Sequence, residues 1–189
     1  MNEQFIRTDK IFHHPERLLA YKEKKCVEPI TVELHLSNLC NCECNYCKFV
    51  EKHNGNVMSE TNAQIVIYKL KSMGVKGLTL SGGGEPTMNP DMINISSFAY
   101  DLGLNLALIT NGIVFDVQCL KYFDWVRFSI DTPDVKTYKQ IRGVNKVEQV
   151  LNNIEKAVKH KHELGINTTI GLQMVVTLEN YSQILWMLT

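Results

Sequence analysis

The sequence has no surplus of charge of either sign, because its 20 lysines and arginines equal its 20 aspartates and glutamates. Such a chain has no overall field that would draw nucleic acid or an anionic membrane, so neither is expected as a partner. No apolar run is long enough to span a bilayer. The first ten residues, MNEQFIRTDK, contain acids and lack the apolar segment of a signal peptide, so a cytoplasmic location is expected.

The sequence also lacks internal repeats, linkers and low-complexity segments, which argues against a repeat protein or a string of modules. A length of 189 residues with 44% apolar residues suits one globular domain with a proper core. Residues 1–29 are predicted to form a polar N-terminal arm with some helical character. Residues 30–189 are predicted to form the core domain.

From residue 30 onward, short apolar runs alternate with helical patterns. Strands are expected at 30–36, 77–81, 104–109, 125–130 and 167–176. Helices are expected at about 60–73, where Thr61 and Gln64 have the spacing of a capping box, from Asn89-Pro90 to near Gly103, at about 114–122, and at 146–164. About five strand-then-helix units predict an α/β fold, with a parallel sheet and helices outside it.

Two of the expected strands have one apolar and one polar face. Thr31, Glu33 and His35 alternate with valine and leucine, and Arg127, Ser129 and Asp131 alternate with Val126, Phe128 and Ile130. A sheet covered on both faces should be apolar throughout, so the polar sets predict a wet cavity inside a barrel-like sheet. His35 would point into this cavity, where a hydrogen-bonded structural role is favoured over an acid–base role.

Four of the six cysteines lie within eight positions, in the segment HLSNLCNCECNYCKFV at residues 35–50. In a reducing compartment, crowded thiols indicate metal or redox chemistry rather than disulfides. Cys40, Cys44 and Cys47 form C-x3-C-x2-C, which differs from the C-x2-C-x2-C run of ferredoxins. Three thiolates would leave one iron of a cubane cluster without a protein ligand, so that an external molecule can bind there.

This segment, directly after the first expected strand, resembles the cysteine motif of the radical S-adenosylmethionine (radical SAM) superfamily. In that family the three cysteines hold a [4Fe–4S] cluster, and the free iron binds the amine and carboxylate of S-adenosylmethionine (SAM). The resemblance covers about residues 30–180. It implies that Cys40, Cys44 and Cys47 are metal ligands in a partial (βα)6-type, TIM-like barrel that apparently lacks its last unit.

Further motifs of the family follow at successive strand ends. Ser81-Gly82-Gly83-Gly84-Glu85-Pro86 is similar to Gly-Gly-Glu-Pro; Gly83 and Gly84 would let the backbone approach SAM, and Glu85 would accept hydrogen bonds from its ammonium. The other residues that the resemblance implies in SAM binding are Tyr46, Asn111, Ser129, Asp131, Arg142, Gln173 and Val175.

The activity that the resemblance implies is reductive cleavage of SAM. An electron from a donor such as flavodoxin or ferredoxin would pass through the cluster to SAM, and the resulting 5′-deoxyadenosyl radical would take a hydrogen atom from a substrate. A small molecule or a peptide with hydrogen-bonding groups would suit the polar cavity.

Other interpretations of the same residues remain open. Cys42 is expected to be a bystander thiol, but with its three neighbours it could form a zinc site, although zinc would explain neither Glu85 nor the order of the motifs. A truncated, catalytically silent iron–sulfur or zinc-binding fragment is the alternative to an enzyme. Gly82–Gly84 and Asn111-Gly112 could be ordinary turns, and Asp131 could cap a helix.

Overall fold

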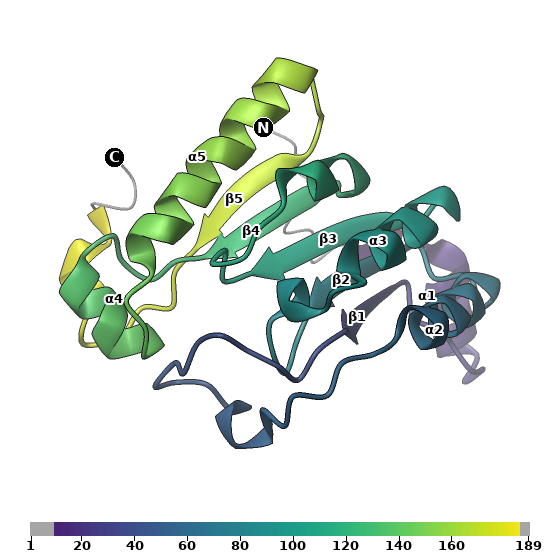
Figure 1. The fold of residues 1–189 in the computed structure, drawn as a ribbon. Coiled ribbons are helices and arrows are strands. Elements are labelled where there is room, and N and C mark those ends of the chain that lie inside the picture. Colours follow the sequence, from purple (N-terminus) through teal and green to yellow (C-terminus); the bar gives the residue numbers. More distant parts are fainter. Residues whose placement is uncertain (1–9, 186–189) are drawn as a thin grey trace.

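A five-stranded parallel sheet forms the centre of the structure, a computed structural model that describes residues 10–185 (Figure 1). The strands are β1 (Thr31–His35), β2 (Gly77–Ser81), β3 (Asn105–Thr110), β4 (Trp125–Ser129) and β5 (Thr169–Gln173). They are paired in chain order, and every pair is parallel. All five strand predictions are confirmed, as is the α/β fold, although the observed β5 is shorter than expected.

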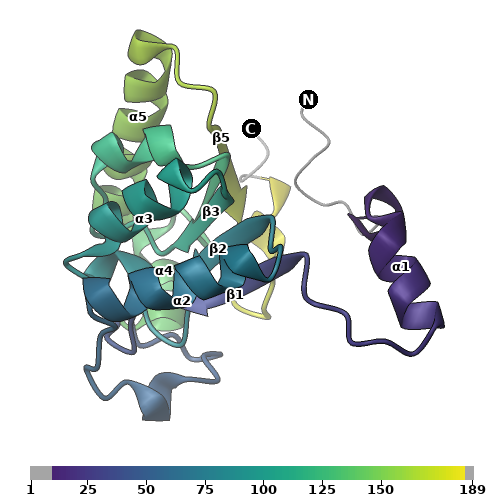
Figure 2. The same ribbon diagram turned by 90° about the vertical axis from the view of Figure 1, so that its right-hand side faces the viewer.

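The strand order determines where the helices lie. Each new strand is added at the same edge of the sheet. Because crossovers between parallel strands are right-handed, every connecting helix then lies on the same face. Accordingly α2 (Glu60–Ser72), α3 (Met92–Asp101) and α5 (Val147–Leu164) cover one face of the sheet (Figure 2). The opposite face curves inward as in part of a barrel. α1 (Pro15–Lys22) lies outside the layers of this unit, and Arg17 joins it to the end of α2 by donating to the carbonyls of Met73 and Gly74, each at 3.4 Å. The boundary between arm and core stays a prediction.

The two faces of the sheet differ in polarity, as expected. Residues of the helix-covered face are buried in one cluster, which includes Leu34, Leu80, Leu108, Val126 and Phe128. On the inner face Glu33 and His35 are exposed, and Arg127 and Ser129 are half-buried. These four residues confirm the predicted polar face, whereas Asp131, predicted to share it, is fully buried.

The connections contain the errors of the sequence-based prediction. The expected helix at 114–122 is instead the 3-10 segment η5 (Val117–Tyr122), which Asp116 caps. A helix that was not predicted, α4 (Val135–Arg142), begins after Asp134, whose side chain accepts a hydrogen bond from the Thr137 amide. Ser59, not Thr61, caps α2. The remaining 3-10 segments are η2 (Lys10–His13), η3 (Val50–Lys52), η4 (Pro86–Met88) and η6 (Tyr181–Gln183).

None of the helices found within residues 10–185 combines the length and apolar character that crossing a membrane requires.

Candidate functional site

The loops that follow the five strands surround a cleft of about 450 Å³ at the carboxyl edge of the sheet. Parallel strands all end at this edge, so residues far apart in sequence meet there. The predicted residues that line the cleft are Cys40, Cys44, Cys47, Tyr46, Gly84, Glu85, Asn111, Ser129, Arg142, Gln173 and Val175. Two predicted residues, Gly83 and Asp131, do not line the cleft.

The cysteine loop, residues 36–49 between β1 and η3, is fixed by backbone contacts to the end of α4. The amides of Glu43 and Asn45 donate to the carbonyls of Arg142 and Ile141, each at 2.9 Å. Gly143 ends the helix with a φ of +75°, and a Cβ there would lie 2.8 Å from Glu43 Cβ and 2.9 Å from its carbonyl oxygen. The backbone at the end of α4, at Ile141 and Arg142, therefore holds the cysteine loop in place.

The glycine-rich loop after β2 packs against the start of the cysteine loop. Gly84 and Glu85 donate their amides to the carbonyls of Ser37 and Leu39 at 2.9 and 2.8 Å. A Cβ on Gly84 would lie 2.4 Å from the Leu39 carbonyl oxygen, so no larger residue fits there without a backbone shift. At Gly84 the close backbone approach in this structure is to the cysteine loop.

Gly83 is held by two histidines. Its amide donates to His35 Nδ1 at 3.2 Å, and its carbonyl lies 2.8 Å from His53 Nε2. Since His35 Nδ1 accepts a hydrogen bond, the ring proton of neutral His35 is on Nε2, which lies 3.0 Å from Glu33 Oε1. These contacts support the structural role that was favoured for His35.

Glu85 connects the ends of β2 and β3. Its Oε1 accepts hydrogen bonds from the Thr87 amide, the Thr87 hydroxyl and the Thr110 hydroxyl, at 3.1, 2.8 and 2.6 Å, and its Oε2 accepts one from the Asn111 amide at 2.7 Å. Burial raises the pKa of Glu85, although these four hydrogen bonds act in the opposite direction. Oε2, with a single donor, keeps the capacity to accept a further hydrogen bond.

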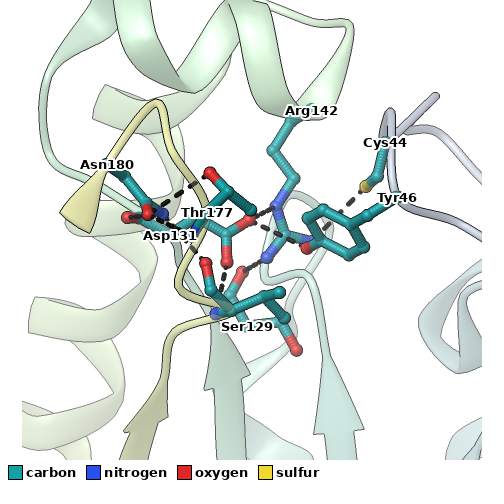
Figure 3. Close-up of polar contacts among 8 residues, drawn as sticks. Cys44, Tyr46, Ser129, Asp131, Arg142, Thr177 and Asn180 are labelled. Atoms are coloured by element: carbon teal, nitrogen blue, oxygen red, sulfur yellow. Dashed lines mark hydrogen bonds and ion pairs between the residues drawn. The ribbon is translucent and has the colours of Figure 1, made fainter.

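Asp131 is a fully buried carboxylate that joins three segments (Figure 3). Oδ1 accepts the Val175 amide at 2.9 Å, and Oδ2 accepts the Tyr46 hydroxyl at 2.8 Å. Arg142 Nε lies 2.6 Å from Oδ2 but makes no well-directed hydrogen bond, so this contact is an ion pair. Asp131 therefore ties the end of β5 and the cysteine loop to α4, and it does not cap a helix.

Arg142 connects this buried network to a cysteine. Its terminal nitrogens donate to the Cys44 sulfur at 3.6 Å and to the Ser129 carbonyl at 2.9 Å, and its guanidinium lies 5.7 Å from the centre of the Tyr46 ring (Figure 3). Burial alone would lower the pKa of Arg142, but Asp131 and Cys44 outweigh it and the net shift is upward. Arg142 is therefore a fixed cation beside Cys44.

The thiols have the chemistry that iron ligands require. A hydrogen bond from Cys42 lowers the pKa of Cys40. A hydrogen bond with Cys42 and, as a smaller effect, the positive charge of Arg142 lower the pKa of Cys44 to about 6, although burial acts in the opposite direction. Thiolates are the form that binds metal, so the donor set fits an iron–sulfur cluster. Cys42, the neighbour that acts on both thiols, is buried and its own pKa is raised, first by its contacts with Cys40 and Cys44 and then by burial.

Within residues 10–185, no three His, Cys, Asp or Glu side chains converge as the ligands of a single metal ion do.

Asn180 is a site residue that sequence reasoning missed. It is fully buried, and its amide nitrogen donates to the carbonyls of Asp131 and Val175 at 3.0 and 2.9 Å. Its side-chain oxygen accepts the Thr177 amide at 2.7 Å (Figure 3). Asn41 was missed too, and it accepts a hydrogen bond from the Asn111 side chain at 2.6 Å. Asn41 occupies an unspecified position of the C-x3-C-x2-C motif and Asn180 lies outside all the motifs, so the sequence offered no signal for either.

The fold and the site together define a class: a parallel αβ protein of partial-barrel type with a three-cysteine loop after its first strand. Residues 34–185 match the family described as the Radical SAM superfamily, and the chain belongs to that family.

Relatives and solved structures agree with this assignment. A probable GTP 3′,8-cyclase of Pyrococcus horikoshii is 30% identical over 148 residues, which cover 75% of this chain and 47% of the relative. A SAM-dependent nucleotide dehydratase of Selenomonas ruminantium is 27% identical over 79% of this chain and 56% of its own length. The chain thus spans about half the length of these relatives. The crystal structure of Streptococcus suis SuiB, at 19% identity, has the same fold over 94% of this chain and 40% of that one, with a TM-score of 0.73.

Members of this family are enzymes that use a [4Fe–4S] cluster and SAM, so these are the cofactors that the chain's family implies.

Proposed function

We propose that the cleft is the SAM-cleaving site of a radical SAM enzyme, with Cys40, Cys44 and Cys47 as the cluster ligands. The observation that supports it most is that these cysteines line one cleft with residues from the ends of all four following strands. When bound, the cluster and SAM supply an electron and a 5′-deoxyadenosyl radical that removes a hydrogen atom from the substrate.

The protein's own groups have distinct roles in this proposal. Tyr46, Asn111, Ser129, Gln173 and Val175 line the cleft and would contact SAM, and Glu85 Oε2 would accept a hydrogen bond from its ammonium. Three residues hold others in position because their polar groups are already engaged within the protein. These are Gly83 between its histidines, Asp131 beneath Tyr46 and Arg142, and Arg142 beside Cys44.

The substrate and the electron donor are finer parts of the proposal. The named relatives include cyclases of GTP and a nucleotide dehydratase, which supports a nucleotide as the substrate. The cleft has about 450 Å³, and cofactor and small-ligand sites have volumes of this order, about 300–1,000 Å³. Flavodoxin or ferredoxin is the proposed electron donor.

The test is anaerobic reconstitution with iron and sulfide, followed by incubation with SAM and dithionite. Wild type should bind about four irons per chain and form 5′-deoxyadenosine. Cys44→Ala should lose the cluster and the product, whereas Cys42→Ala should keep both because Cys42 is not a proposed ligand. Stoichiometric zinc in the wild type, with no 5′-deoxyadenosine, would overturn the proposal.

A further inference from the structure

Arg127 is a cation of the cleft for which residues 10–185 provide no anionic partner. It lies on β4, lines the cleft, and its Nε is buried with no hydrogen-bond acceptor. The other two arginines of residues 10–185 both have carboxylate partners: Arg17 pairs with Glu28, and Arg142 with Asp131. Arg127 as a whole is half-buried, so its guanidinium is partly desolvated, and an anion that enters the cleft would supply the missing partner.

The structure leaves room for an anion next to this guanidinium. In the register between β4 and β5, Arg127 lies opposite Gly171. A Cβ placed on Gly171 would meet no atom within 4 Å, so the space beside Arg127 is open. Trp125 lies two residues earlier on the same face of β4, and the Arg127 guanidinium is 5.0 Å from the centre of its ring. The guanidinium thus contacts the Trp125 ring, and the neighbouring position on β5 leaves open space.

The depth of Arg127 separates it from the proposed SAM contacts. Ser129 and Gln173 face each other at the strand ends, level with the loops that bear the cysteines. Arg127 is two residues before Ser129, which places it about 6.6 Å deeper along the strand on the same face. A group that reaches Arg127 would therefore lie below the SAM contacts, on the side away from the cysteine loop.

We propose that Arg127 binds an anionic group of the substrate, a phosphate or a carboxylate, in the space left open by Gly171. This inference rests on the proposed function, since it assigns the substrate end of the same cleft. A guanidinium offers paired N–H donors that match either anion, and its stacking on Trp125 fixes the plane from which they point. Arg127 is then a specificity-determining residue.

Trp125 provides a readout that does not depend on turnover. The chain has two tryptophans, so Trp186→Phe leaves Trp125 as the single emitter. Cluster-loaded protein saturated with SAM is titrated with tripolyphosphate, citrate, GTP and the uncharged nucleoside guanosine. SAM blocks the upper part of the cleft, and the comparison of tripolyphosphate with citrate distinguishes phosphate from carboxylate.

The expected result is a saturable change in Trp125 emission with at least one anion and none with guanosine alone. Arg127→Met should weaken this binding about 10- to 100-fold, and Arg127→Lys should weaken it less. Gly171→Val should also abolish binding, because it fills the open space while keeping the charge and suits a strand. Lys139→Met removes an exposed positive charge on α4 and should titrate like the parent.

Two results would overturn the proposal: no anion changes the emission, or the Arg127→Met and Gly171→Val proteins titrate like the parent. Continued formation of 5′-deoxyadenosine in these proteins would show that the radical SAM function itself stands. If the parent protein forms no 5′-deoxyadenosine, the proposed function fails separately, and the anion titration still decides the role of Arg127.

Discussion

Arg142 and Asp131 form an ion pair in the interior, with Nε 2.6 Å from Oδ2 and side-chain exposures of 5% and 0%. The pair does more than neutralise two charges. Asp131 also accepts a hydrogen bond from Tyr46, and Arg142 donates to the Cys44 sulfur. The ion pair therefore connects the cysteine loop to the rest of the site.

Breaking this pair on one side should be costly. Arg142→Met leaves the Asp131 carboxylate buried without a counter-ion, and the expected loss in unfolding free energy is about 3–5 kcal/mol. Asp131→Asn should lose a comparable amount, and the double variant less than the sum of the two. Urea denaturation measures these values. Lys139→Met, a charge loss on the exposed side of α4, should stay within about 0.5 kcal/mol of wild type. An Arg142→Met protein as stable as this control would contradict the account.

Two glycines with similar backbones allow the cysteine loop to be tested separately from helix capping. Gly143 ends α4 with φ +75° and Gly165 ends α5 with φ +62°. Alanine at either position should cost about 1–2 kcal/mol, because the left-handed conformation is unfavourable with a Cβ. Only at Gly143 does the new Cβ collide with the cysteine loop, whereas at Gly165 it meets nothing within 4 Å. Iron retention after reconstitution should therefore fall in Gly143→Ala and remain normal in Gly165→Ala. Equal retention in both would show that this collision is unimportant.

Glu85 should make stability depend on pH. Burial raises its pKa in the folded protein above the ordinary value of the unfolded chain. The stability from its protonated form is fully present below the unfolded pKa and is lost as pH rises through the folded pKa. Glutamine cannot ionise, so the stability difference between wild type and Glu85→Gln should shrink as pH rises through this window. Unfolding free energies from urea titrations at a series of pH values measure it. A difference that widens with pH would contradict the direction of the shift.

Much of the architecture was predictable because its signals are local. Alternating polar and apolar residues identified β1 and β4, and the long apolar stripe identified α5. Since parallel strands end at one edge, motifs after successive strands had to meet, and the cleft brings them together.

The missed features depend on weaker or longer-range signals. α4 has only three buried residues, Tyr138, Ile141 and Arg142, so its apolar stripe is too short to stand out. Its cap is Asp134, three residues after Asp131, the position that the sequence offered as a possible cap. At α2 two capping residues compete, and Ser59 is preferred over the Thr61–Gln64 spacing. The ion pair of Asp131 and the hydrogen bonds of Asn180 join segments that only the tertiary fold brings together.

The central claim is that three thiolates hold a cluster whose fourth iron is open to SAM. Electron–nuclear double resonance on the reduced, cluster-loaded protein tests it directly, with SAM labelled with ¹⁵N in its amino group and ¹⁷O in its carboxylate. The account predicts hyperfine coupling from both labels, lost in Cys44→Ala together with the cluster. Bound SAM without coupling from either label would contradict it.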